Sequence, residues 1–266
     1  MASSHRSEVN ELAPGVPPDY YRSMYDVEER HWWYLGMSRI AAAILGERLR
    51  RQGQRLLDAG CGTGGFLRWA LDSGSFDEAV GIDLSSAALE LARERAPEAT
   101  FRAAPVSEVP LESSSVDLAV LNDVLQHIHE DEVGPSLQEL SRVLVPGGAL
   151  LIRTNGARRF RRERDDWRAY DAATLRTVVT DVGLRIERLT YANMILALWG
   201  VTRGAAPKAP TDERHGIPLG MPSHAKQAIG LRILSAEAAY LRRSGASLPF
   251  GHNLFALATK PDNATV

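Results

Sequence analysis

The stretch Leu56-Leu57-Asp58-Ala59-Gly60-Cys61-Gly62-Thr63-Gly64-Gly65 decides the fold of this 266-residue chain. An apolar run leads into a glycine-rich turn, and the following residues have the pattern of a helix. Because glycine has no Cβ, the backbone of such a turn can lie close to a bound ligand. The stretch therefore predicts a strand-turn-helix unit with Gly60 and Gly62 against a ligand.

The pattern downstream of Arg55 predicts a doubly wound α/β fold. Short apolar runs alternate with helical segments, which is typical of successive βαβ units. We expect a seven-stranded, mostly parallel sheet with helices on both faces, an N-terminal helical lid and a helical insert before the last strand. Strands are expected near 55–60, 79–84, 99–104, 116–122, 148–154, 184–191 and 253–259. Helices are expected near 64–73, 85–96, 132–144 and 171–181, the last capped by Asp171.

Composition shifts divide the chain into four parts. Residues 1–18 are polar and proline-bearing, and we interpret them as a flexible leader. Residues 19–54 are rich in aromatic side chains and are expected to form the helical lid. The core is assigned to 55–193 and 246–266. Residues 194–245 are expected to lie over the carboxyl edge of the sheet and to cap the acceptor.

Bulk composition excludes several classes of partner. A formal net charge of -2, with no separate run of Lys or Arg, does not predict nucleic-acid binding. Cys61 is the single cysteine, so an intrachain disulfide is impossible and a reducing compartment is indicated. No apolar run has the length of a signal peptide or of a membrane span. We therefore expect a cytoplasmic protein without stable membrane insertion.

Two carboxylates narrow the choice of ligand. Asp58, just before the glycines, would repel a pyrophosphate but suits a ligand with an ammonium or sulfonium group. Asp83 ends the second strand, where a carboxylate can accept hydrogen bonds from both ribose hydroxyls. An NAD-dependent oxidoreductase shares the glycine turn and the ribose acid. Asp58 and the segment Pro146-Gly147-Gly148 disfavour that alternative.

At these residues the chain resembles the Rossmann-like (class I) S-adenosylmethionine (SAM)-dependent methyltransferases, within a type 11/12-like bacterial subgroup. Leu56 to Phe66 is similar to the first motif of that family, Asp83 to its second, and Leu140 to Gly148 to its signature before strand five. The resemblance implies SAM as cofactor, S-adenosylhomocysteine (SAH) as product and a small-molecule acceptor, with natural-product biosynthesis as a role. A non-catalytic SAM-binding protein remains an alternative.

The resemblance also assigns positions around the cofactor. It implies that Leu84, directly after Asp83, also belongs to the cofactor site. It further implies that Val106 and Leu125 lie beside the adenine of SAM and that Asn122 lies beside its methionine part. An arginine at the Arg39 position would bind the carboxylate of SAM, which suits its planar guanidinium. From their aromatic character, three lid residues could close over the sulfonium or could pack the lid onto the sheet. These are Tyr25, Trp32 and Trp33.

Candidate catalytic residues follow the fourth strand. Asp123 and His127 are four residues apart and would be neighbours on a helix, where the acid could orient a histidine base. The alternative is that His127 only packs or caps beneath the site. The cluster is similar to an acid-x-x-acid-His metal group of ubiquinone-pathway O-methyltransferases, but Gln126 replaces the second acid. No metal site is therefore expected.

The acceptor is the least determined part of the prediction. Five arginines between Arg158 and Arg164 could bind an anionic substrate, or could form a solvated loop balanced by neighbouring acids. The apolar residues around 195–199 could line a hydrophobic pocket, pack in the core or form a homodimer contact. The sequence leaves the acceptor, the methylated atom (oxygen, nitrogen or carbon) and the oligomeric state open.

Overall fold

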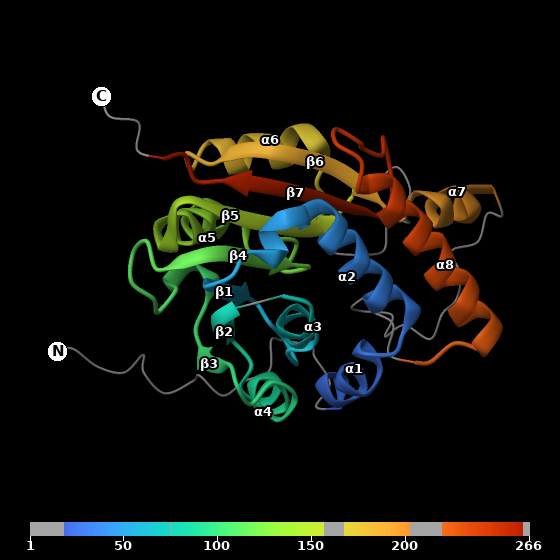
Figure 1. The fold of residues 1–266 in the computed structure, drawn as a ribbon, viewed down its shortest axis with the longest axis horizontal. Coiled ribbons are helices and arrows are strands. Elements are labelled where there is room, and N and C mark those ends of the chain that lie inside the picture. The colour runs from blue at the N-terminus through green and yellow to red at the C-terminus, as the bar shows by residue number, and fades with distance from the viewer. Residues whose placement is uncertain (1–18, 75, 157–167, 203–219, 263–266) are drawn as a thin grey trace.

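The computed structural model describes residues 19–74, 76–156, 168–202 and 220–262. Its centre is one seven-stranded sheet with strand order β3-β2-β1-β4-β5-β7-β6 (Figure 1). Strand β7 runs antiparallel to β5 and β6, and the other pairs are parallel. The predicted α/β fold is confirmed. The strands are β1 (Gln54–Ala59), β2 (Phe76–Asp83), β3 (Thr100–Ala103), β4 (Val116–Asn122), β5 (Leu144–Asn155), β6 (Arg185–Ala192) and β7 (Asn253–Thr259).

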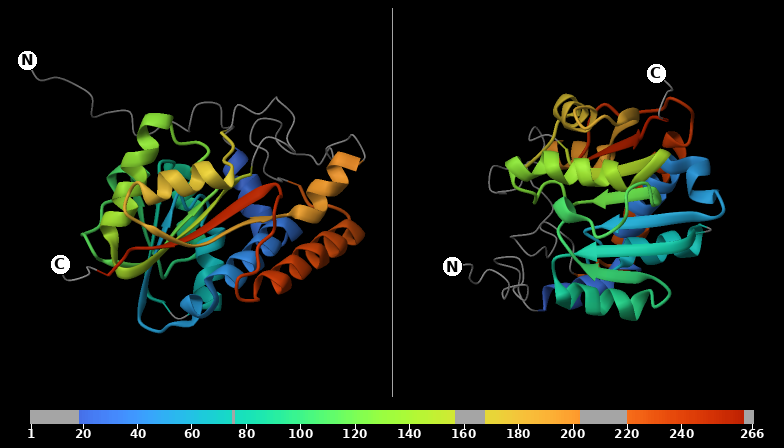
Figure 2. Two further views of the ribbon diagram at one scale, coloured as in Figure 1. Left: turned by 90° about the horizontal axis from the view of Figure 1, so that it is seen from above. Right: turned by 90° about the vertical axis from the view of Figure 1, so that its left-hand side faces the viewer.

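Helices cover both faces of the sheet, as the two views of Figure 2 show. One face packs against α2, α3, α4 and α8, and the other packs against α5, α6 and the short η2. The helical segments are α1 (Tyr20–Glu28), α2 (Trp32–Leu45), η1 (Gly46–Arg50), α3 (Gly65–Ser73), α4 (Ser86–Arg95), η2 (Val106–Glu108), α5 (Glu130–Val143), α6 (Ala172–Thr180), α7 (Met194–Thr202) and α8 (His224–Leu241).

Alternation along the strands divides the apolar side chains between two cores. Successive side chains of a strand point to opposite faces. Leu56 lies in the core beneath α2 and α3, whereas Leu57 lies in the core beneath α5 and α6. Leu151 and Leu150 of β5 divide in the same way. The central strands are therefore buried on both faces, as expected for parallel strands covered by helices.

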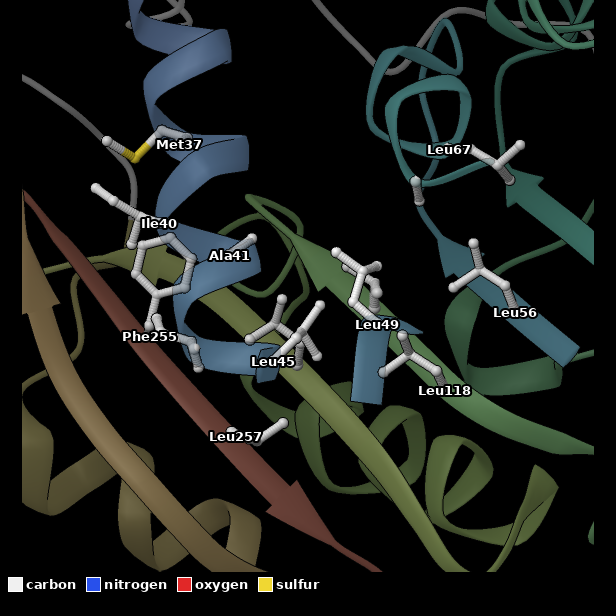
Figure 3. Packing of buried hydrophobic residues seen from close by; sticks show 14 of the residues in the cluster. Met37, Ile40, Ala41, Leu45, Leu49, Leu56, Leu67, Leu118, Phe255 and Leu257 are labelled. Carbon is white, nitrogen blue, oxygen red and sulfur yellow. The ribbon is translucent and has the colours of Figure 1, made fainter. Parts of the chain in front are cut away.

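Helix α2 belongs to the core as well as to the lid. Met37 and Ile40 are fully buried and lie on the side of α2 that faces Phe255 of β7 (Figure 3). Its other neighbour is α8, which approaches closely because small residues stand at the contact. A Cβ at Gly36 would come within 2.3 Å of Leu234 Cδ1. The second half of the predicted lid is thus fixed in place by the sheet and by α8.

The segment before β5 differs from the prediction. Strand five was expected near 148–154, but β5 begins at Leu144 and includes Pro146-Gly147-Gly148. The register with β4 moves from Val116↔Leu144 to Leu118↔Ala149, so the segment forms a bulge within the strand. Gly147 has φ +74° at this bulge, and its N–H donates to Lys260 O at 2.9 Å. Hydrogen bonding to the residue that follows β7 stabilises the irregularity.

The start of α6 confirms one cap. Asp171 precedes α6, and its Oδ1 accepts a hydrogen bond from Thr174 N at 2.7 Å. This contact satisfies one of the free N–H groups of the first helical turn, as predicted.

The insert between β6 and β7 consists of two helices joined by a segment outside the described residues. A buried carboxylate links them, because Glu237 of α8 accepts hydrogen bonds from Asn193 N (2.7 Å) and Ile195 N (3.0 Å) at the start of α7. Helix α8 lies beside α2 (Figures 1 and 2). No helix in the described part of the chain has both the length and the apolar character needed to cross a membrane.

Candidate functional site

A cavity of about 830 Å³ opens at the carboxyl ends of β1, β2, β4 and β5, beneath α1 and the start of α2. This is the edge at which open α/β sheets bind their ligands. The cavity brings together many residues that the sequence singled out, although they are far apart in the chain. Those lining it are Trp33, Asp58, Gly60, Gly62, Asp83, Leu84, Val106, Asn122, Asp123 and His127.

The glycine turn and Asp83 form the floor of this cavity. Gly60 and Gly62 have φ +75° and +52°, in the left-handed region that favours glycine. Asp83 Oδ2 accepts a hydrogen bond from Gly62 N at 2.9 Å, and Oδ1 accepts one from Ser85 N at 2.9 Å. Burial raises the pKa of Asp83, and these backbone N–H groups oppose the rise. The carboxylate is therefore held in one orientation at the end of β2.

Asp58 and Asn122 are buried polar side chains at the ends of neighbouring strands. Asp58 Oδ2 and both amide atoms of Asn122 have no hydrogen-bond partner among the described residues. Burial raises the pKa of Asp58 to about 7, with a further rise from Glu28 and an opposing effect from Arg153. Buried polar groups are normally paired. Both side chains are thus suited to a polar ligand, and Asp58 to a cationic one.

A buried arginine binds the first of the two predicted catalytic residues. Asp123 Oδ2 accepts hydrogen bonds from Arg153 Nε (3.0 Å) and Nη2 (2.7 Å). The backbone of Asp123 has φ +56°, and its N–H donates to Arg153 O at 2.8 Å. The ring of Trp33 lies on the guanidinium, 5.1 Å from its Cζ. His127 is exposed at the same cavity.

A second buried ion pair attaches α1 to the glycine turn. The side chains of Arg95 and Glu28 are only 2% and 11% exposed, and they hydrogen bond to each other. Glu28 also accepts a hydrogen bond from Thr63 Oγ1, and Arg95 donates to Thr63 O at 3.0 Å. Burial raises the pKa of Glu28, whereas Arg95 and Thr63 oppose the rise. One cluster thus joins the end of α1, the glycine turn and the end of α4.

Three residues assigned to the cofactor do not line the cavity. Tyr25 has its ring beneath the guanidinium of Arg95, 4.0 Å from its Cζ. Leu125 is fully buried in the core beneath α5. Arg39 is exposed, and its Nη1 donates to Ser235 Oγ on α8 at 2.5 Å. Arg39 lies in the middle of α2, where the helix faces α8, and this contact carries its side chain away from the cavity.

Two further expectations concern the 194–245 insert and the arginines between 158 and 164. No described residue of the 194–245 insert lines the cavity, and 203–219 lies outside the described residues, so its role as a cap stays a prediction. The arginines between 158 and 164 also lie outside the described residues. Within the described ranges, no group of three or more His, Cys, Asp or Glu side chains is placed to hold a metal ion.

Comparison with known proteins relates part of the chain to a protein family. The family model described as "Methyltransferase domain" matches residues 57–152, from β1 through most of β5. This is the segment that supplies Asp58, the glycine turn, Asp83 and Asn122 to the cavity. This part of the chain is therefore similar to methyltransferases, including SAM-dependent ones.

Individual methyltransferases match different shares of the chain. A malonyl-[acyl-carrier protein] O-methyltransferase of Enterobacter lignolyticus is 36% identical over 133 residues, 50% of this chain and 51% of that protein. A probable S-adenosylmethionine-dependent methyltransferase of Mycolicibacterium smegmatis is 28% identical over 215 residues, 78% of this chain and 76% of that protein. The chain thus spans only about half the length of several curated relatives.

Solved structures agree on the fold. A chain from the complex of the Haloferax volcanii Trm112 methyltransferase activator with a methyltransferase superposes with a TM-score of 0.60 at 19% identity. The match covers 94% of this chain and 96% of that chain. SAM is the cofactor of the family.

The polar groups of the cavity are of the kinds that SAM requires. Asp83 presents a fixed carboxylate that suits a ribose diol, and the unpartnered Asp58 oxygen suits an ammonium group. Leu84 is 61% exposed at the cavity and offers an apolar surface next to Asp83. Val106 is buried where the chain leaves β3. These features favour adenosine over β2 and β3 and methionine toward β4.

Sequence reasoning missed three charged residues of the site. Glu28 and Arg95 are 67 positions apart and lie in no motif, so no local signal connects them. Arg153 carries a signal that could have been used. It is a charged residue that directly follows the apolar run of β5, at the edge of the sheet where ligands bind.

The raised pKa of Asp58 generates a prediction about pH. A cationic ligand binds the ionised carboxylate, so affinity should fall as pH drops below about 7, where free Asp58 becomes protonated. We expect SAH to bind about tenfold more tightly at pH 8 than at pH 6 in calorimetric titrations. Asp58→Asn should bind more weakly, with little change over this range. An unchanged pH profile in Asp58→Asn would assign the effect to another group, such as His127.

The buried Glu28–Arg95 pair generates a prediction about stability. Arg95→Met leaves Glu28 buried without its cation and should lower the free energy of unfolding by about 3 kcal/mol in urea denaturation. The matched control is Arg50→Met, which removes the exposed ion pair with Glu47 and should cost less than about 0.5 kcal/mol. Equal effects of the two substitutions would show that the buried pair does not stabilise the lid.

Proposed function

We propose that this chain transfers the methyl group of SAM to a small-molecule acceptor. The observation that carries the proposal is the convergence of Asp58, the glycine turn, Asp83 and Asn122 on one cavity. Its volume of about 830 Å³ lies in the upper part of the range typical of small-ligand sites, roughly 300–1,000 Å³. A site of this size has room for an acceptor beside the cofactor.

Methyl transfer requires mainly that the protein positions two reactants in line and removes a proton where the acceptor carries one. The bound cofactor supplies an electrophilic methyl group. Asp83 and the glycine turn hold the ribose, Asp58 and Asn122 bind the amino-acid end, and Trp33 and Leu84 shield the cavity from water. His127 is the proposed base, because it is exposed at the cavity just after β4.

For the acceptor we propose a set of small-molecule classes rather than one compound. Natural-product biosynthesis in the cytoplasm is our working role, and the formal net charge of -2 argues against nucleic acid as the acceptor. Several relatives are named as malonyl-[acyl-carrier protein] O-methyltransferases, so acyl thioesters with a free carboxylate belong in the acceptor panel. Hydroxyl, amine and activated-carbon acceptors complete it.

The direct test is release of SAH from SAM in the presence of this panel. Sustained release with one acceptor supports the proposal. Binding of SAM without turnover across the panel and cell extracts would favour the non-catalytic alternative.

A substitution tests the proposed base on whichever acceptor is found. His127→Ala should lower turnover about 100-fold at saturating acceptor while leaving SAH affinity unchanged, because a positioned base accelerates only the chemical step. His129→Ala is the matched control, since this ring lies two residues along and pairs with Asp131. Unaltered turnover of His127→Ala at saturating acceptor would show that His127 is a packing residue.

A further inference from the structure

A cation in the cavity would suit the α-carboxylate of SAM, and the arginine that the resemblance assigned to it, Arg39, lies elsewhere. Arg39 is exposed on α2 and donates to Ser235 of α8. Among the described lining residues, the arginines are Arg68 and Arg153. Arg68, on α3, donates to Asp72 and Glu98 beside its own helix. Arg153, at the end of β5, is the remaining candidate.

The position of Arg153 fits this task, because one carbon atom carries both the ammonium and the carboxylate of methionine. The cation that meets the carboxylate must therefore lie near the group that meets the ammonium. Arg153 is close enough to Asp58 for its charge to lower the pKa of that side chain. It is also the register partner of Asn122, the residue at the end of β4. Asp58, Asn122 and Arg153 thus follow one another across β1, β4 and β5.

The surroundings of Arg153 hold its guanidinium in one orientation. Asp123 Oδ2 accepts from Nε and Nη2, and Trp33 covers a face of the group. The side chain is only 9% exposed. A planar guanidinium has five N–H donors, so it can bind a second carboxylate after the first is satisfied. Asp123 orients the donor group and compensates its charge while no ligand is bound.

We propose that Arg153, oriented by Asp123 and Trp33, binds the α-carboxylate of SAM in place of Arg39. This inference rests on the proposed function, because it concerns the cofactor of the same site. It assigns the pair Asp58 and Arg153 to the two charged groups of the methionine end. Asp123 then acts as a positioning residue for Arg153.

Two ligands that differ only at the amino-acid end test the assignment. SAH carries the α-carboxylate, whereas 5′-methylthioadenosine lacks the whole amino-acid group. Calorimetric titration of Arg153→Met should show SAH affinity reduced about 10- to 100-fold, the range for a lost hydrogen bond between charged groups, with 5′-methylthioadenosine affinity unchanged. Arg39→Met, the rival assignment, should leave both affinities within about twofold of the unmodified protein.

Two further variants separate binding from folding. Asp123→Asn keeps both the guanidinium of Arg153 and a side-chain oxygen that can accept its hydrogen bonds. This variant should therefore retain SAH affinity within about threefold. Arg153→Lys keeps the charge without the planar fork and should give an intermediate loss confined to SAH, which serves if Arg153→Met does not fold.

Several results would overturn the inference. Equal loss of both ligands in Arg153→Met and Arg153→Lys would make Arg153 a structural residue, and no loss would exclude it from the cofactor site. Selective loss of SAH in Arg39→Met would restore Arg39. Failure of the unmodified protein to bind either ligand would remove the proposed function itself.

Discussion

The ion pair between Glu28 and Arg95 is the contact on which the site depends. It joins the end of α1 to the glycine turn through Thr63, and its two side chains are almost completely buried. A buried pair of this kind is costly to form and still more costly to break on one side. Its value here is positional, because α1 supplies Tyr20, Tyr21 and Met24 to the roof of the cavity. The lid is therefore fixed to the turn that it covers.

Below this contact, the charges of the cavity are arranged along the order of the strands. Asp83 ends β2, Asp58 lies near the end of β1, Asn122 ends β4 and Arg153 lies near the end of β5. Because the strands are neighbours in the sheet, these four side chains lie next to one another along its carboxyl edge, in the order of the strands. An elongated ligand with a diol at one end and an amino acid at the other matches that order.

The sequence allowed the sheet and ten of the residues that line the cavity to be predicted, because those features are local. Each of these features is contained in a few residues. They are the short apolar runs of β1 to β5, the glycine turn and the acidic residues at the strand ends. Arg39, Tyr25 and Leu125 were assigned by resemblance, and packing decided their positions: α8 binds Arg39, Arg95 covers Tyr25, and the α5 core encloses Leu125. Contacts over long separations, such as Glu28 with Arg95, leave no pattern in a single sequence. The bulge in β5 was missed because it depends on pairing with the chain after β7.

The most direct test of the account is calorimetric titration of the unmodified protein and of Asp83→Ala with SAM, SAH and NADH in parallel. We expect the unmodified protein to bind SAM and SAH but not NADH. We expect Asp83→Ala to lose most of its affinity for SAM and SAH while its circular dichroism spectrum is unchanged. Binding of NADH alone, or unaltered SAM affinity in Asp83→Ala, would contradict the account.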